Sequence, residues 1–231
     1  MNCNCLVLFS CLLAVNTARA QDAIFEDNFS TLHIARPGWT SVYTHLAPDT
    51  MSISVQPVTG GPVPFAATFE LKKDAPASTL GQASYIRSGP IAIPGKSFSI
   101  EWYENIVDGF GGPVFELWDN VGAQPNDRSG KCLEINRGPM YLTLQKKGIA
   151  DVQPGWRHFK IAVDTTTNTC DVFYEDMDKP AASGAAIDGH PNTWDHIGIG
   201  FCLYISPGTH PTQWQLGGIK IAETKAPPQQ P

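Results

Sequence analysis

Residues 155–176 constrain the fold of this chain more than any other stretch. In its first part, apolar residues alternate with more polar ones, which is the period-two pattern of a strand buried on one face. The apolar residues are Phe159, Ile161 and Val163. The short polar run at residues 164–169 suits a turn, and residues 170–175 alternate again with high β-propensity. The stretch therefore predicts a strand–turn–strand hairpin.

This hairpin resembles the signature of concanavalin A-like, laminin-G-like jelly rolls. The matching residues are Trp156, Ile161, Val163, Asp164, Val172 and Tyr174. A weaker resemblance reaches both ends of the chain, with an aromatic–acidic strand at residues 25–29 followed by Pro37-Gly38-Trp39. The resemblance implies an all-β, two-sheet antiparallel jelly-roll sandwich. It implies no single activity, because this fold carries lectins, adhesion modules, hydrolases and lyases.

The rest of the chain also reads as short strands joined by turns. Alternating or strongly β-prone runs occur at residues 49–55, 65–72, 83–93, 96–107, 114–119, 132–136, 140–145, 196–205 and 213–222. Residues 177–192 are rich in Pro, Ala and Gly, which predicts a loop. No amphipathic helix is apparent. Antiparallel sheets with one apolar face each must pack those faces together, which predicts a sandwich independently of the resemblance.

The N-terminus reads as a secretory signal. Residues 1–20 contain an apolar run followed by Ala18-Arg19-Ala20, an A-x-A cleavage site. An alternative is a lipobox at residues 8–11 that would lipidate Cys11. We expect one β-sandwich domain at residues 21–223 and a disordered tail at residues 224–231. No later run approaches the ~20 apolar residues that span a bilayer, so we expect an exported protein, secreted or periplasmic.

Charge and cysteine content narrow the partners. Loss of Arg19 with the signal takes the net charge from −6 to −7, which argues against nucleic acid or anionic membranes as partners. Three cysteines remain after the signal, Cys132, Cys170 and Cys202. Export permits one disulfide among them, with three pairings open. Cys/His spacings typical of zinc sites are absent from the sequence.

A polar sheet face is the predicted site. Three neighbouring strands place a carboxylate opposite their apolar residues, in each case with an aromatic or amide residue two positions on. The pairs are Glu101 with Tyr103, Glu116 with Trp118, and Glu134 with Asn136. On one sheet face these side chains would bind a sugar, with rings stacking on the aromatics and hydroxyls bonding to carboxylates and amides. The alternative is an ordinary solvated face.

Other tryptophans and two glycines complete this interpretation. Trp39, Trp156 and Trp214 are predicted to lie in the core, whereas Trp194, in a loop, joins Trp118 as a candidate for function. Gly198 and Gly200 alternate with the apolar residues of their strand and predict the close approach of backbone or ligand.

Catalysis by the same face is an alternative. A glycosidase needs two carboxyls at a defined separation, and Glu101, Glu116 and Glu134 are the candidates. The E-x-D-x-x-E strand of laminarinase-like members of this fold is absent, as are the Gln-x-His and Tyr-x-Lys patterns of alginate-lyase-like members. No Ser or Cys nucleophile lies in a recognisable elbow.

The leading interpretation is an exported, non-catalytic, lectin-like module that binds a polysaccharide or cell-surface glycan. The alternatives are a polysaccharide hydrolase or lyase and a structural or adhesion module that binds protein. No cofactor is required by this interpretation. Jelly rolls often hold one Ca²⁺ near the first strand, and Glu26 and Asp27 are the candidate ligands, with a solvated strand end as the other interpretation.

Overall fold

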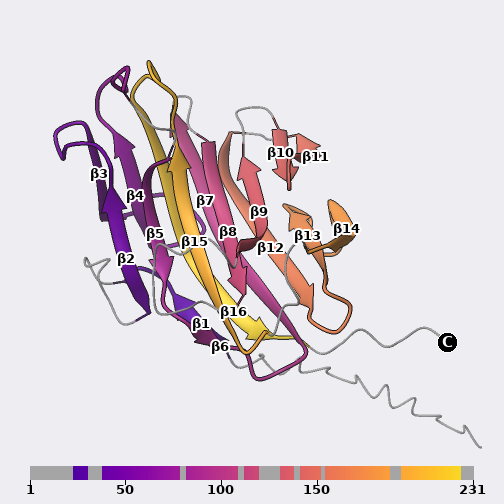
Figure 1. The fold of residues 1–231 in the computed structure, drawn as a ribbon. Helices are drawn as coiled ribbons and strands as arrows, with labels where there is room; N and C mark the ends of the chain where they lie inside the picture. Colours follow the sequence, from indigo (N-terminus) through magenta and orange to yellow (C-terminus); the bar gives the residue numbers. More distant parts are fainter. Residues whose placement is uncertain are drawn as a thin grey trace, which may run out of the picture.

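The structure, a computed structural model, describes residues 23–30, 38–78, 82–108, 112–119, 131–137, 141–151, 154–187 and 194–224. Within these residues the chain forms two antiparallel sheets of eight strands each and no helix (Figure 1). The predicted two-sheet jelly-roll sandwich is confirmed. The described part contains no helix with the length and apolar character to cross a membrane. The predicted signal at residues 1–20, Cys11 included, and residues 225–231 of the predicted tail lie outside the described residues.

Sheet A contains the first and last strands of the described chain. Its strands in spatial order are β14 (Ala182–Ala186), β13 (Thr169–Tyr174), β12 (Gly155–Asp164), β7 (Ser97–Asp108), β16 (Thr212–Glu223), β4 (Phe65–Leu71) and β3 (Met51–Pro57). β1 (Ala23–Asp27) also pairs with β16. Strands distant in the sequence, such as β7 and β16, lie side by side (Figure 1).

Sheet B contains the other eight strands. Its strands in spatial order are β11 (Lys147–Asp151), β10 (Tyr141–Leu144), β9 (Lys131–Arg137), β8 (Gly112–Asp119), β15 (His196–Tyr204), β5 (Gln82–Ser88) and β2 (Trp39–Thr44). The two-residue β6 (Ile91–Ala92) pairs with β15.

The hairpin that was expected to organise the fold is present as β12 and β13. Ile161 pairs with Val172, and both are fully buried. The Asp164 carboxylate accepts the backbone N–H of Thr166 at 2.8 Å, which stabilises the turn, and Asn168 takes a positive φ of 57°. Local alternation and turn chemistry were therefore sufficient to predict this element.

One local prediction needs correction, and one strand was not predicted. The segment expected to be a loop at residues 177–192 contains β14, whose small residues carry little β-propensity but pair with β13. The strand β11 follows β10 through a tight turn at Gln145 and Lys146, both with positive φ, and has no strong alternation of its own. In both cases pairing with a neighbouring strand overrides a weak local preference.

The core fills the space between the inner faces of the sheets. The Trp102 ring lies at a crossing point, stacked 5.1 Å from the Phe159 ring in its own sheet and 4.7 Å from the Phe115 ring of sheet B. Such aromatic pairs add about 0.5–1.5 kcal/mol each beyond the burial of apolar area. Trp39 and Trp214 are buried as predicted.

A buried ion pair also joins the sheets. Arg137 of β9 donates to Glu104 of β7 at 2.9 Å, and both side chains point inward. Burial raises the pKa of Glu104, and the charge and hydrogen bond of Arg137 oppose that rise. The sequence analysis assigned no role to either residue.

The three cysteines in the described part of the chain are all thiols. Cys132, Cys170 and Cys202 are buried and form no disulfide with one another. The predicted possibility of one disulfide is therefore not realised in this structure.

Candidate functional site

The six residues predicted to share one polar face are divided between the two sheets. Glu101 and Tyr103 belong to β7 in sheet A. The outer face of sheet B receives the other four, which are Glu116, Trp118, Glu134 and Asn136. The prediction that all six residues share one face is therefore wrong for Glu101 and Tyr103, because β7 and β8 are consecutive in the sequence but lie in different sheets. Alternation determines which side of a strand is buried, and does not determine its neighbours.

One row of residues crosses the outer face of sheet B. From β5 to β9 the row contains Arg87, Gly200, Glu116 and Glu134, each in register with the next. Register partners on one face have side chains close enough to interact. Glu116 and Glu134 are therefore direct neighbours. Arg87 had no predicted role at this face, because a single arginine in a strand carries no local signal.

The centre of the row is buried. Glu116 is fully buried, and its carboxylate lies 3.6 Å from Arg87 Nη2 and 3.5 Å from Lys131 Nζ. The thiol of Cys202 donates to the same carboxylate, with Sγ 3.3 Å from Oε2. Two cations and a thiol thus surround one anion. A carboxylate this buried requires such partners.

Trp118 covers this centre. A Cβ at Gly200 would lie 2.5 Å from the Trp118 ring, so only glycine leaves room for the indole over β15. The Arg87 guanidinium lies between two rings, 5.1 Å from that of Trp118 and 4.2 Å from that of Tyr85. Gly200 thus admits a close approach, but the approaching group is the Trp118 side chain and not the backbone or ligand that was predicted. The indole is buried, at 6% exposure, so the expected exposed stacking surface is absent there.

Glu134 is the accessible part of the row. Its carboxylate pairs with Lys131, and Asn136 donates to it at 2.6 Å. Burial raises the pKa of Glu134, but hydrogen bonds from Lys131 and Asn136 outweigh it and hold the pKa below its usual value. Burial likewise opposes the charge on Lys131, yet Glu134 and Glu116 raise the pKa of Lys131. Both groups therefore stay charged at neutral pH.

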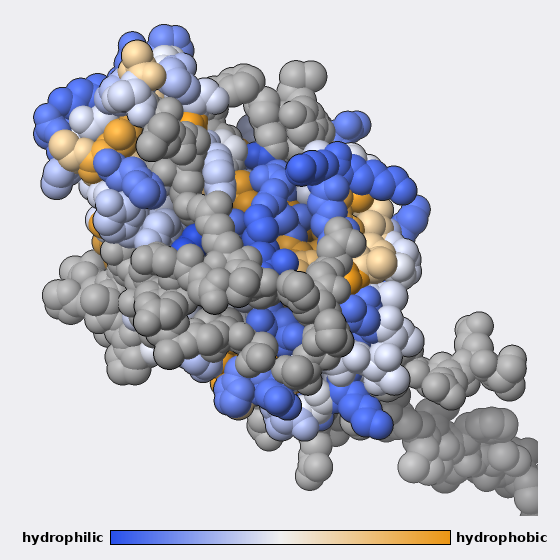
Figure 2. All heavy atoms as spheres, in the orientation of Figure 1, coloured by the Kyte–Doolittle hydropathy of each residue, from blue (hydrophilic) through white to orange (hydrophobic). Residues whose placement is uncertain are grey.

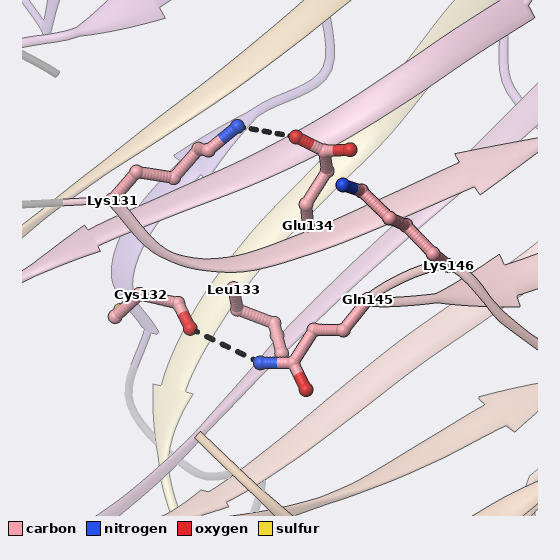
Figure 3. Close-up of a pocket in the computed structure, with 6 residues that line it drawn as sticks. All are labelled: Lys131, Cys132, Leu133, Glu134, Gln145 and Lys146. Atoms are coloured by element: carbon pink, nitrogen blue, oxygen red, sulfur yellow. Dashed lines mark hydrogen bonds and ion pairs between the residues drawn. The ribbon is translucent and has the colours of Figure 1, made fainter. Parts of the chain in front are cut away.

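A pocket of about 370 Å³ opens beside Glu134 (Figure 3). It lies between the first half of β9 and the turn after β10. Its lining residues are Lys131, Cys132, Leu133, Glu134, Gln145 and Lys146. Gln145 donates its side-chain N–H to the Cys132 carbonyl at 3.5 Å, and the Lys146 side chain points toward Glu134 (Figure 3). The pocket offers an anionic acceptor flanked by two cationic donors.

Hydrophilic side chains gather over the middle of the molecule in the view of Figure 2, with apolar side chains showing between them. A surface that mixes fixed polar groups with apolar area suits a ligand that has both hydroxyls and C–H faces.

Glu101 and Tyr103 form a separate cluster on the outer face of sheet A. His158 Nε2 lies 2.6 Å from Glu101 Oε1, and the Tyr103 and His158 rings stack 4.2 Å apart. The hydrogen bond with His158 lowers the pKa of Glu101. This cluster lies on the opposite side of the sandwich from Glu134.

The two remaining tryptophan predictions need correction. Trp194 is buried at 6% exposure, its backbone N–H donates to Asp119 at 2.9 Å, and its ring lies 5.8 Å from the Phe98 ring. It therefore packs in the core. Trp156 is half-buried on the outer face of sheet A, because it is in phase with His158 and out of phase with Phe159.

The proposed calcium ligands have different environments. Asp27 is buried, and its two oxygens accept the Phe29 N–H at 2.7 Å and the Trp39 indole N–H at 2.6 Å. Glu26 is exposed and faces Lys220 in register. No group of three or more metal-binding side chains lies together in the described part of the chain. Calcium binding stays a prediction, and Asp27 has a structural role that ties β1 to the core.

Comparison with known proteins gives the fold. No protein-family model and no curated protein matches the sequence. A GH16 protein of a Bacteroides ovatus mixed linkage glucan PUL, in complex with a G4G4G3G product, has a TM-score of 0.54 at 11% identity, over 86% of this chain and 99% of its own. SCLam, a non-specific endo-β-1,3(4)-glucanase of family GH16, has a TM-score of 0.54 at 12% identity, over 88% and 91%.

The globular domain of T. cruzi calreticulin has a TM-score of 0.50 at 10% identity, over 88% of this chain and 89% of its own. With its two antiparallel sheets, the chain has the concanavalin A-like jelly-roll fold. At these identities the likeness concerns the fold, so the function must be argued from the site.

Proposed function

We propose that this protein binds a glycan, without turnover, through the pocket beside Glu134 on the outer face of sheet B. One observation carries the proposal. A carboxylate that is partly exposed and fixed by Lys131 and Asn136 lines an open pocket, next to a buried polar network that holds it in place. Sugar hydroxyls bond well to such preoriented carboxylates, amides and ammonium groups.

The buried network supports this role by preorganising the pocket. Arg87 and Glu116 lie directly behind Glu134 in the row, and Lys131 contacts both carboxylates. A receptor whose groups are already oriented loses less entropy on binding. The likeness to structures named as glucan-acting GH16 proteins agrees with a carbohydrate ligand.

Hydrolysis is the second candidate, because Glu116 and Glu134 are adjacent across β8 and β9. Two carboxyls in one cleft are what a glycosidase requires. A general acid, however, needs a raised pKa, and the pKa of Glu134 is lowered. Glu116 is fully buried and faces two cations and a thiol, so it has no open side toward a substrate. These features favour binding over catalysis.

We also propose that the chain is exported, with residues 1–20 as its leader, so that the ligand would be a polysaccharide or a cell-surface glycan. Calcium bound near Glu26 and Asp27 is not needed for the pocket, which draws its charges from Lys131, Glu134 and Lys146.

The test is a glycan array with the full chain expressed with its own leader, followed by calorimetry on any hit. Glu134→Gln and Asn136→Ala are each expected to weaken binding about 10- to 100-fold, since a hydrogen bond to a charged group contributes about 1.5–3 kcal/mol. Lys179→Ala, on an exposed loop, is the matched control.

Each outcome has a defined meaning. Binding without product supports the proposal. Release of shorter sugars that Glu134→Gln abolishes would establish a polysaccharide-degrading enzyme instead. Silence of the folded protein on a broad array would overturn glycan binding and favour a module that binds protein.

A further inference from the structure

The outer face of sheet A has its own set of polar and aromatic side chains. Trp156 of β12 is in register with Asn105 of β7, which is in register with Gln215 of β16. All three side chains are half-buried. In the adjoining row, Tyr103 is in register with His158. This face is therefore accessible, unlike the centre of the opposite face.

We propose that this face is a second glycan-binding site, for an uncharged oligosaccharide, so that one copy of the chain binds two glycans on opposite sides of the sandwich. The inference rests on the proposed function, because it assumes that the protein is a glycan binder. It names a site and a ligand class that are independent of the pocket beside Glu134.

The amide side chains of Asn105 and Gln215 give this face hydrogen-bonding groups for a ligand. Asn105 Nδ2 donates to Gln215 Oε1 at 3.0 Å. This bond uses one end of each amide and fixes both side chains. Asn105 Oδ1 and Gln215 Nε2 are left as one acceptor and one donor, with no other bond to a described residue. An oriented acceptor–donor pair matches a sugar hydroxyl, which both donates and accepts.

Glu101 supplies a second acceptor. His158 holds Oε1 at 2.6 Å, and the side chain is 35% exposed. Oε2 makes no bond to a described residue. The carboxylate is thus fixed at one oxygen and available at the other.

The charges around Glu101 indicate a neutral ligand. Lys160 and Lys220 are its register partners on the two sides, and Glu26 follows Lys220. The signs therefore alternate across four strands. A row of alternating charge has no net field to attract a polyanion, whereas a polyanion site needs an excess of cations.

The face also has a wall. The segment between β3 and β4 folds over sheet A, where a Cβ at Gly61 would lie 2.7 Å from Trp156 Nε1. Val63 of the same segment is buried against Gly217 and Gly218 of β16. A Cβ built at Gly217 would lie 2.8 Å from Val63 Cγ2, and a Cβ built at Gly218 would lie 2.9 Å from Val63 Cγ1. This wall stands beside the half-buried Trp156 indole, whose apolar ring suits the C–H face of a sugar.

One ligand molecule cannot occupy both faces at the same time. The inner faces of the sheets pack together, so their outer faces point in opposite directions. A monomer with two sites cross-links glycan-coated surfaces, and multivalent attachment raises avidity.

The experiment is calorimetry of the monomeric full chain with the neutral oligosaccharide selected on the array. We expect two sites per chain. The double change Asn105→Ala with Gln215→Ala is expected to remove one site, shown as a loss of about tenfold or more in its affinity, and Glu134→Gln to weaken the other. Ser52→Ala on β3 is the control on the same sheet. Gln215→Ala alone serves if the double variant unfolds, and thermal unfolding reports on folding for each.

The outcomes separate the two proposals. One site per chain, lost only with Glu134→Gln, overturns this inference and leaves the proposed function standing. One site lost only with the Asn105 and Gln215 changes supports the sheet A site and overturns the pocket. Agglutination of glycan-coated beads by the monomer, abolished by either change, supports both. Absence of any glycan binding overturns both.

Discussion

At the residue scale, glycine and tryptophan on neighbouring strands determine the shape of the sheet B face. The Trp118 ring occupies the space above Gly200 and thereby closes one side of the Arg87 guanidinium. The aromatic ring is a packing element here, although its position in the alternation is that of a solvent-facing residue.

Gly200→Ala is expected to destabilise the protein by about 1–3 kcal/mol, because the new methyl group must displace the indole. Gly148→Ala is the matched control, since nothing lies within 4 Å of a Cβ built there. Urea denaturation measures the free energy of unfolding, and near-ultraviolet circular dichroism reports the tryptophan environment. Equal stability of the two variants would contradict this account of Trp118.

At the scale of elements, the β12–β7 pairing is reinforced on its outer side by the bond between Glu101 and His158. The hydrogen bond with His158 holds the pKa of Glu101 below its usual value of 4.5 in the folded state. A lowered folded pKa means that the contribution to stability is present above the unfolded pKa and is lost as the pH falls through the folded pKa.

The difference in stability between the wild type and Glu101→Gln should therefore be largest near neutral pH and shrink as the pH falls below 4.5. Urea midpoints of the two proteins across this pH range measure the difference, with Glu70→Gln on β4 as the control. A difference that does not vary with pH would show that Glu101 contributes through packing alone.

The contact between the two sheets includes the buried ion pair of Arg137 with Glu104. Arg137→Met removes the partner of Glu104 and leaves a carboxyl group, whose pKa burial already raises, without its cation. We expect a loss of about 3–5 kcal/mol, as is typical when one partner of a buried pair is removed. Because a raised folded pKa favours the protonated form, this loss should grow as the pH rises.

The double variant Arg137→Met with Glu104→Gln should recover part of that loss, since no buried charge remains. Chemical denaturation of the wild type, the two single variants and the double variant gives the coupling free energy between Arg137 and Glu104. Additive effects of the two changes would contradict a direct interaction between these residues.

At the scale of the whole molecule, the sandwich protects its thiols. Burial raises the pKa of Cys132 and of Cys170 to about 12 each. Only the thiolate reacts readily, so these thiols should resist iodoacetamide at mildly alkaline pH while the protein is folded. Mass spectrometry should show that these two thiols are labelled at the rate of unfolding. The labelling rate should increase with denaturant concentration in parallel with the unfolding rate. Rapid labelling of the native protein would indicate local opening between the sheets.

Much of the architecture was predictable because it is local. The alternation in residues 155–176 and the Asp164 turn specify a hairpin with Phe159 facing the core. Similar alternation predicted β7, β8 and β15 and the side of each that faces the core, although the opposite sides of β8 and β15 are buried as well. β14 was missed because its alanines and glycine have weak β-propensity.

The candidate site was only partly predictable, because its contacts are not local. Glu134 and Asn136 were found from their position opposite the apolar residues of β9. The pairing of Arg87 with Glu116 was not predicted, since Glu116 lies on β8 and is reached across β15. Likewise, only the pairing of β7 with β12 brings Glu101 to His158.

By itself, the sequence determined the all-β class, the sandwich and the buried side of most strands, because these follow from periodicity within a few residues. Tertiary structure alone decided which strands became neighbours, and so placed β7 and β8 in different sheets. Pairing between strands depends on contacts distant in the sequence. That dependence separated the six predicted residues into two faces, buried Trp118 and left Glu134 at an open pocket.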